Sequence, residues 1–177
     1  MERKLMEKKT SIQKVNQKGA VLVGIVMGSQ SDWETMKHAA VTLETLKISN
    51  KVAIHSAHRT PHRLTEWVMK LEKQGTKIFI AGAGMAAALP GVVAAITTKP
   101  VLGCPMQTSF MGGLDSLLSM VQMPGGIPVG VMAVGRAGAI NSALLAASIL
   151  ALSDPKIYKA LKKFRTQQTE AVPLKPN

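Results

Sequence analysis

The sequence of 177 residues has a single cysteine and few aromatic residues. Cys104 has no partner for a disulfide within the chain, and the apolar run "PVLGCPM" around it predicts a buried structural thiol rather than a nucleophile. Aromatic residues make up 3% and hydrophobic residues 46% of the chain. This composition excludes collagen-like, disordered and disulfide-rich classes, and suits one domain with a buried parallel sheet covered by helices.

Charge is almost absent from the middle of the chain. Between residues 78 and 152 the only charged side chains are Lys99, Asp115 and Arg136. So few charges cannot cover the surface of a monomer, and we expect a homo-oligomer. Long apolar runs are also missing, because Gly, Pro, Ser, Gln and Asn interrupt each one before it reaches about 18 residues, so we expect no membrane span.

Acidic residues are scarce, and the 22 basic and 10 acidic residues give a net charge of +12. Such an excess is typical of nucleic-acid binders. Here it lies in the tails: residues 1–18 hold six basic and two acidic groups, and residues 156–177 hold six and one. No aromatic residues alternate with the tail lysines, so we expect solvated tails and no nucleic-acid partner, with salt-sensitive binding by the tails as the alternative.

The opening of the sequence has no apolar segment typical of a signal peptide, and its glutamates argue against a transit peptide. We therefore expect a cytoplasmic protein. The composition divides the chain into a basic N-terminal tail at 1–19, a single α/β domain at 20–153, and a basic C-terminal helix and tail at 154–177.

A strand, a loop and a helix recur five times along the chain. This alternation predicts a three-layer αβα sandwich with a five-stranded parallel sheet. Pro61 suits the first position of a helix, after Thr60 as N-cap, and Gly75 suits the end of that helix. We expect strands at 20–27, 51–56, 77–82, 100–106 and 127–135, helices at 33–47, 61–75, 89–98, 113–122 and 137–152, and a last basic helix at 155–169.

Unusual polar or small-residue loops follow four of the expected strands. They read "GSQSD", "SAHRTP", "AGAGMAAALPG" and "MQTSFMGG". In open parallel sheets, ligands bind beyond the carboxyl ends of the strands. We therefore expect these loops to converge on one pocket.

The loop "GSQSD" combines a glycine turn with hydroxyl and carboxylate groups. Ser29 and Ser31 suit an anion at a helix start, whereas Asp32 suits a pair of ribose hydroxyls. The alternative is that Ser31 or Asp32 only caps the helix. The loop is neither a Walker loop nor a dinucleotide fingerprint, so ATP and NAD are not expected.

The segment "GAGMAA" fits the dinucleotide pattern G-x-G-x-x-A in form only. It follows the third expected strand rather than the first, and no acidic residue lies about 20 positions further on to hold a ribose. We therefore expect these small residues to allow close backbone approach to a ligand or a neighbouring subunit.

Three histidines lie within eight positions, at His55, His58 and His62. The proline at position 61 places the helix start after His58, and no cysteine or carboxylate cluster is near, so no metal site is expected. We expect His62 to be solvated and His55 to face either the core or the cleft. His58 differs because Arg59 beside it can grip a phosphate, while a neutral imidazole can move protons near pH 7.

Five motifs together resemble the N5-carboxyaminoimidazole ribonucleotide mutase family, class I, over residues 20–153. They are "GSQSDW", "SAHRTP", "AGAGMAAALPG", "GLDSLLSMVQMPGGIPVG" and "GRAGAINSALLAASILA". The resemblance implies a flavodoxin-like sandwich assembled as a homo-octamer, with active sites at subunit junctions. It also implies an isomerase of purine biosynthesis that moves a carboxylate from the exocyclic nitrogen of its ribonucleotide substrate to the imidazole carbon, without metal, ATP or organic cofactor.

The resemblance also assigns roles to residues. It implies that His58 is the general acid and base of the reaction. It implies substrate binding by Ser29, Asp32 and Arg59. We expect three further residues of the same motifs to bind the substrate as well, namely Ser31, Ser56 and Gly84.

The chain departs from the family pattern at two positions. Where the family usually shows "GGAAHLPG", this chain has Met85 for the second glycine and Ala88 for the histidine. Without that imidazole, either turnover falls or another group, such as His55, replaces it. Two further alternatives therefore stay open: a class II carboxylase that uses free carbon dioxide, and a paralogue that binds a ribonucleotide without turnover.

Overall fold

A five-stranded parallel sheet forms the centre of the protein. The computed structural model describes residues 20–175. The strands lie in the order β2-β1-β3-β4-β5, and every neighbouring pair is parallel. The predicted fold class is confirmed. The strands are β1 (Val23–Met27), β2 (Asn50–Ile54), β3 (Ile78–Ala83), β4 (Val101–Pro105) and β5 (Gly130–Val131).

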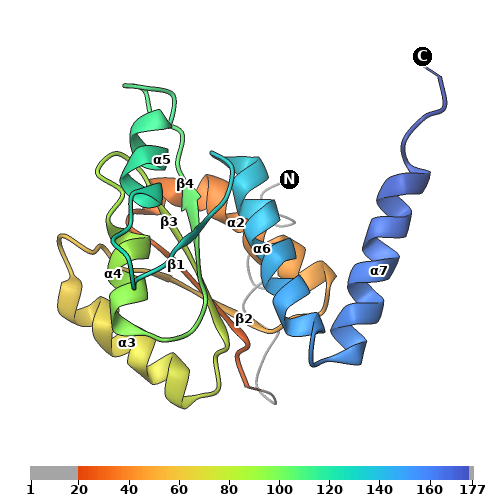
Figure 1. The fold of residues 1–177 in the computed structure, drawn as a ribbon, viewed down its shortest axis with the longest axis horizontal. Coiled ribbons are helices and arrows are strands. Elements are labelled where there is room, and N and C mark those ends of the chain that lie inside the picture. The colour runs from red at the N-terminus through yellow and green to blue at the C-terminus, as the bar shows by residue number, and fades with distance from the viewer. Residues whose placement is uncertain (1–19, 176–177) are drawn as a thin grey trace, which may run out of the picture.

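Helices cover both faces of the sheet (Figure 1). α2 and α6 pack on one face with α7 beyond α6, and α3, α4 and α5 pack on the other. β1, β3 and β4 are buried along their whole length, as expected for strands with helices on both sides. The helices are η1 (Gln30–Asp32), α2 (Trp33–Thr45), α3 (Pro61–Lys73), α4 (Leu89–Ile96), α5 (Leu114–Val121), α6 (Arg136–Ala151) and α7 (Pro155–Glu170).

The last strand is much shorter than the nine residues predicted for it. Only Gly130 and Val131 pair with β4. Pro128 cannot donate a ladder hydrogen bond, which delays the start of the strand. Beyond it the chain stays beside β4 through isolated bonds, from the N–H of Met132 to Gly103 O (2.9 Å) and from the N–H of Gly135 to Pro105 O (2.8 Å).

The signals predicted for the helix at 61–75 are confirmed at both ends. Pro61 occupies the first turn of α3, and Gly75 follows the helix with a φ of 97°. Thr60 is the N-cap residue, but its side chain makes no cap bond. Its hydroxyl is used instead inside the preceding loop, where it accepts the N–H of Ser56 at 2.9 Å.

The carboxyl ends of the strands form one edge, where the strand order reverses between β1 and β3. This is the place where open α/β sheets bind ligands. The loops 28–32, 55–60 and 84–88 follow β1, β2 and β3 there. Among residues 20–175, no helix combines the length and apolar character needed to cross a membrane. The predicted tail at 1–19 lies outside the described residues.

Candidate functional site

The loop after β1 is a compact capping structure. Ser29 is the N-cap of η1, its N–H donates to Asp32 Oδ2 at 3.0 Å, and its Oγ accepts the Ser31 hydroxyl at 3.0 Å. The capping alternative named Ser31 or Asp32, but the N-cap of η1 is Ser29. Asp32 is its capping-box partner and makes no side-chain cap bond at the start of α2. The box also fixes both side chains at the β1/β3 switch point, so capping and ligand binding are compatible.

Asp32 occupies a half-buried position in this loop. Burial raises the pKa of its carboxyl above the ordinary value of 3.8, against the lowering effect of hydrogen bonds from Ser29, Gly28 and Ser31 and of the Arg59 charge. A carboxylate that has lost part of its water is a strong acceptor for hydroxyl groups. This environment suits the binding of neutral donors such as ribose hydroxyls.

The loop after β2 is closed by hydrogen bonds among its own residues. The N–H of Thr60 donates to Ser56 O at 2.9 Å, and Ser56 Oγ accepts the N–H of Arg59 at 3.2 Å. Arg59 then reaches across to the neighbouring loop, where its Nη2 donates to Gly28 O at 3.1 Å. The structure thus brings Ser29, Asp32, Ser56 and Arg59 together, and exposes His58 beside Arg59 on the same loop.

The three histidines have separate surroundings. The ring centroids of His55 and Trp67 lie 5.6 Å apart, and Arg63 Nη2 lies 3.5 Å from Nδ1 of His55. His62 is exposed in the first turn of α3, as predicted. Within residues 20–175, no three His, Cys, Asp or Glu side chains are grouped so that they could hold a metal ion.

The stability of the protein is expected to fall as the pH drops below about 6.5, the ordinary pKa of histidine. Burial, with help from Arg63, lowers the pKa of His55, and burial followed by Arg136 lowers that of His38. The folded protein therefore binds these protons less tightly than the unfolded chain does, so acid favours unfolding. Urea unfolding between pH 5 and 8 should show a shallower pH dependence in His55→Gln. An unchanged slope, or an equal change in the control His62→Gln, would contradict this assignment.

The loop after β3 is built from small residues around one strained position. Met85 is not a glycine but has a φ of 60°, and its side chain is 71% exposed. Ala87 is buried, and Ala88 is partly buried at the N-cap of α4. Gly84 lies against the loop after β4, because a Cβ there would be 3.2 Å from Met106 Cβ.

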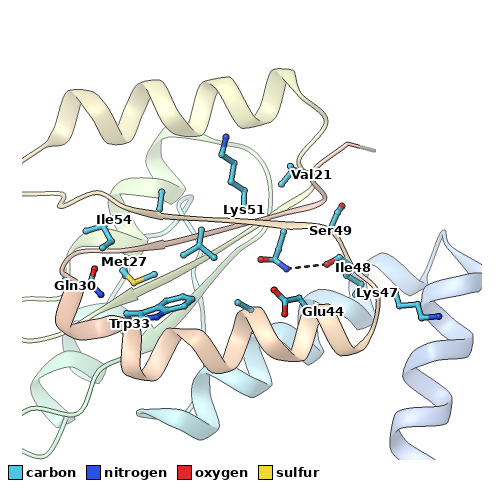
Figure 2. Close-up of a pocket in the computed structure, with 14 residues that line it drawn as sticks. Val21, Met27, Gln30, Trp33, Glu44, Lys47, Ile48, Ser49, Lys51 and Ile54 are labelled. Carbon is cyan, nitrogen blue, oxygen red and sulfur yellow. Dashed lines mark hydrogen bonds between the residues drawn. The ribbon is translucent and has the colours of Figure 1, made fainter. Parts of the chain in front are cut away.

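One hollow in the described part of the structure touches these loops only through Gln30. It is a groove of about 960 Å³ between α2 and the edge strand β2. Figure 2 shows Met27, Gln30 and Trp33 toward one end and Ser49 toward the other. The six predicted substrate-binding residues and His58 lie outside its lining. The loops after β1 and β2 meet at this edge through Arg59 and Gly28, whereas the convergence of all four loops on one pocket stays a prediction.

Cys104 lies at the middle of the core with no exposed surface. Burial raises the pKa of its thiol to about 12, with a smaller contribution from Asp32. Its Sγ lies 3.6 Å from Gly135 O. The complete burial of Cys104 confirms the predicted buried thiol, and its raised pKa disfavours the thiolate that a nucleophile needs.

The strand order and the polar loops at the β1/β3 switch point define an α/β protein with a candidate ligand site at this edge. Within this class, the sequence model of the AIR carboxylase family matches residues 22–171, and the chain belongs to that family. The match continues through α7, beyond the region that carries the five sequence motifs.

Several similar proteins carry the same name. A Brucella melitensis protein named N5-carboxyaminoimidazole ribonucleotide mutase is 56% identical over 158 residues, covering 89% of this chain and 98% of that protein. The Escherichia coli K12 protein of the same name is 52% identical over 150 residues, covering 85% and 89%. The alignment with the crystal structure of Treponema denticola PurE covers 84% of this chain and 92% of the Treponema chain, with a TM-score of 0.78 and 31% identity. The predicted family and flavodoxin-like fold are confirmed.

Proposed function

We propose that this chain is an N5-carboxyaminoimidazole ribonucleotide mutase, an isomerase of purine biosynthesis. The observation that carries the proposal is the hydrogen bond from Arg59 to Gly28 O, which joins the loops after β1 and β2 into one site. The chain that makes this bond is 56% identical to a Brucella melitensis protein of that name, and the alignment covers almost the whole of the Brucella protein. The product is 4-carboxy-5-aminoimidazole ribonucleotide.

The joined loops supply groups for each part of a ribonucleotide. Arg59 and the hydroxyls of Ser29 and Ser31 suit the phosphate, because a guanidinium and clustered hydroxyls donate to its oxygens. Asp32 accepts hydrogen bonds from the ribose hydroxyls. Ser56 holds Arg59 in place through the bond to its backbone N–H, and Gly84 lets the substrate approach the backbone of the third loop.

His58 carries the proton in this mechanism. It delivers a proton to the exocyclic nitrogen, the bond from nitrogen to the carboxylate carbon breaks, and carbon dioxide and the free amine result. The electron-rich imidazole carbon of the substrate then attacks the carbon dioxide and forms the new carbon–carbon bond. His58, now neutral, removes the proton from that carbon, so the proton it gave is recovered in each turnover.

Retention of carbon dioxide requires a closed, dry site. The loop 84–88 provides small apolar side chains for such a wall, and Ala87 is 2% exposed. We assign completion of the enclosure to a neighbouring subunit, because the charge-poor segment between residues 78 and 152 favours subunit contacts. Ala88 leaves the wall without the imidazole that the family usually shows, and we assign the proton transfer to His58.

We also propose a homo-oligomer, of which an octamer is the form that the family resemblance implies. Support comes from apolar side chains along one exposed side of α5 and the loop before it, such as Phe110 (82% exposed) and Leu118 (48%). A cytoplasmic location and a catalytic domain at 20–153 flanked by basic tails belong to the same proposal.

The test is conversion of N5-carboxyaminoimidazole ribonucleotide by the purified full-length protein, followed by chromatography of the nucleotide products. Formation of the 4-carboxy isomer faster than in a protein-free sample supports the proposal. A folded protein that forms none contradicts it.

A further inference from the structure

The loop after β3 is held by α5 through the backbone of a single residue. The N–H of Met85 donates to Ser116 Oγ at 3.0 Å, and Met85 O lies 3.2 Å from the hydroxyl of Ser119. Ser116 is fully buried. The Ser119 hydroxyl is shared with Asp115 O at 2.8 Å, so Ser116 makes the stronger contact.

Met85 needs such a contact because of its backbone conformation. With a φ of 60° it lies in the left-handed region, where a Cβ crowds the following carbonyl. Its side chain is 71% exposed, so burial of that side chain does not offset the strain. The hydrogen bond from its N–H to Ser116 is therefore a direct interaction that favours this conformation over a relaxed one.

The helix that supplies this serine is itself fixed to the next loop. Thr108 Oγ1 donates to Asp115 Oδ1 at 2.7 Å and accepts the N–H of Gly113 at 3.2 Å, which ties the first turn of α5 to the loop after β4. Ser116 follows Asp115 directly. The contact with Met85 thus connects the loops after β3 and β4 at the edge that carries the proposed site.

We propose that Ser116 is a positioning residue that keeps the loop 84–88 closed on the carbon dioxide formed during turnover. This inference rests on the proposed function. When the bond to Met85 is lost, the strained residue relaxes, the wall loosens, and carbon dioxide escapes before the imidazole carbon captures it. The enzyme then releases aminoimidazole ribonucleotide in place of the 4-carboxy product.

The test measures how each turnover is divided between these two products. N5-carboxyaminoimidazole ribonucleotide is supplied at saturation, and the protein-free rate of decarboxylation is subtracted. In Ser116→Ala we expect the ratio of aminoimidazole ribonucleotide to 4-carboxy product to rise about fivefold, the factor that corresponds to one hydrogen bond of typical net strength. KM should change little, because Ser116 is not one of the substrate-binding residues.

Ser142→Ala is the matched control. Ser142 is also fully buried in a helix, but its hydroxyl donates to Gly138 O within α6, at 2.8 Å. The product ratio of the Ser142→Ala protein should equal that of the wild type. Met85→Gly in the Ser116→Ala background should restore the wild-type ratio in part, because glycine adopts a φ of 60° without a crowded Cβ.

Three results would overturn the role of Ser116 or the function on which it rests. A Ser116→Ala protein that loses stability or total rate while keeping the wild-type ratio would overturn the proposal, because Ser116 would then be only structural. If this variant does not fold, Ser116→Cys, which keeps the shape and weakens the acceptor, must show the raised ratio, and an unchanged ratio would overturn the proposal in the same way. A wild-type protein that forms neither product overturns the proposed function itself, and the role of Ser116 with it.

Discussion

Replacing His58 with asparagine is expected to lower kcat by about 10²- to 10⁴-fold, the usual contribution of a positioned general acid and base. Asparagine keeps a polar side chain of similar reach but cannot exchange a proton near neutral pH. Because phosphate and ribose binding is assigned to other residues, the dissociation constant of the product nucleotide should stay within a few fold of the wild-type value. Steady-state kinetics and isothermal titration calorimetry measure the two quantities.

His62→Asn is the matched control for this experiment. His62 lies four residues further along, in the first turn of α3, and its side chain is exposed. The control should keep the wild-type kcat. Near-normal turnover in His58→Asn, or equal losses in both variants, would show that His58 is not the proton carrier.

Replacing Gly138 with alanine is expected to destabilise the fold by about 3 kcal/mol, at the upper end of the range for overpacked positions. A Cβ at this position would overlap the carbonyl of Ala133 and approach Cys104 Sγ to 3.3 Å. Backbone atoms cannot move aside as a side chain can, so α6 would have to shift from its place against β4. The gain in helix propensity from glycine to alanine, about 1 kcal/mol, does not cancel this overlap.

The control for Gly138→Ala is Gly125→Ala. A Cβ added at Gly125 would meet no heavy atom within 4 Å, and this glycine is exposed. The substitution should change the free energy of unfolding by less than about 0.5 kcal/mol. Urea denaturation of both variants measures the difference. If Gly138→Ala were as stable as the control, the close packing of α6 against the loop after β5 would be incorrect.

Much of the fold could be predicted from the sequence because the strands are apolar on both faces and the helices are amphipathic. "AVLVGIVM" and "KIFIAG" show this pattern clearly, and both form central strands. "IPVGVMAVG" has the same apolar character but forms a strand of only two residues. Apolar composition does not distinguish an edge segment with a proline and glycines from a regular strand.

The candidate site could be predicted only as a set of loops. Residue types indicate a phosphate grip at Arg59, but the bond from Arg59 to Gly28 O joins residues 31 positions apart and depends on the order of the strands. The departure at Met85 is visible in the sequence, whereas its left-handed backbone and its contact with Ser116 are not. The sequence does not indicate which loop a serine within an amphipathic helix contacts.

The most direct measurement of the central claim is the fate of carbon dioxide during turnover. N5-carboxyaminoimidazole ribonucleotide is converted in bicarbonate-depleted buffer with a scavenger for free carbon dioxide, beside a parallel reaction from aminoimidazole ribonucleotide and bicarbonate. A mutase forms the 4-carboxy product in the first reaction at an undiminished rate, because the carbon dioxide never leaves the site. Product formation in the second reaction alone would contradict the account and identify a carboxylase.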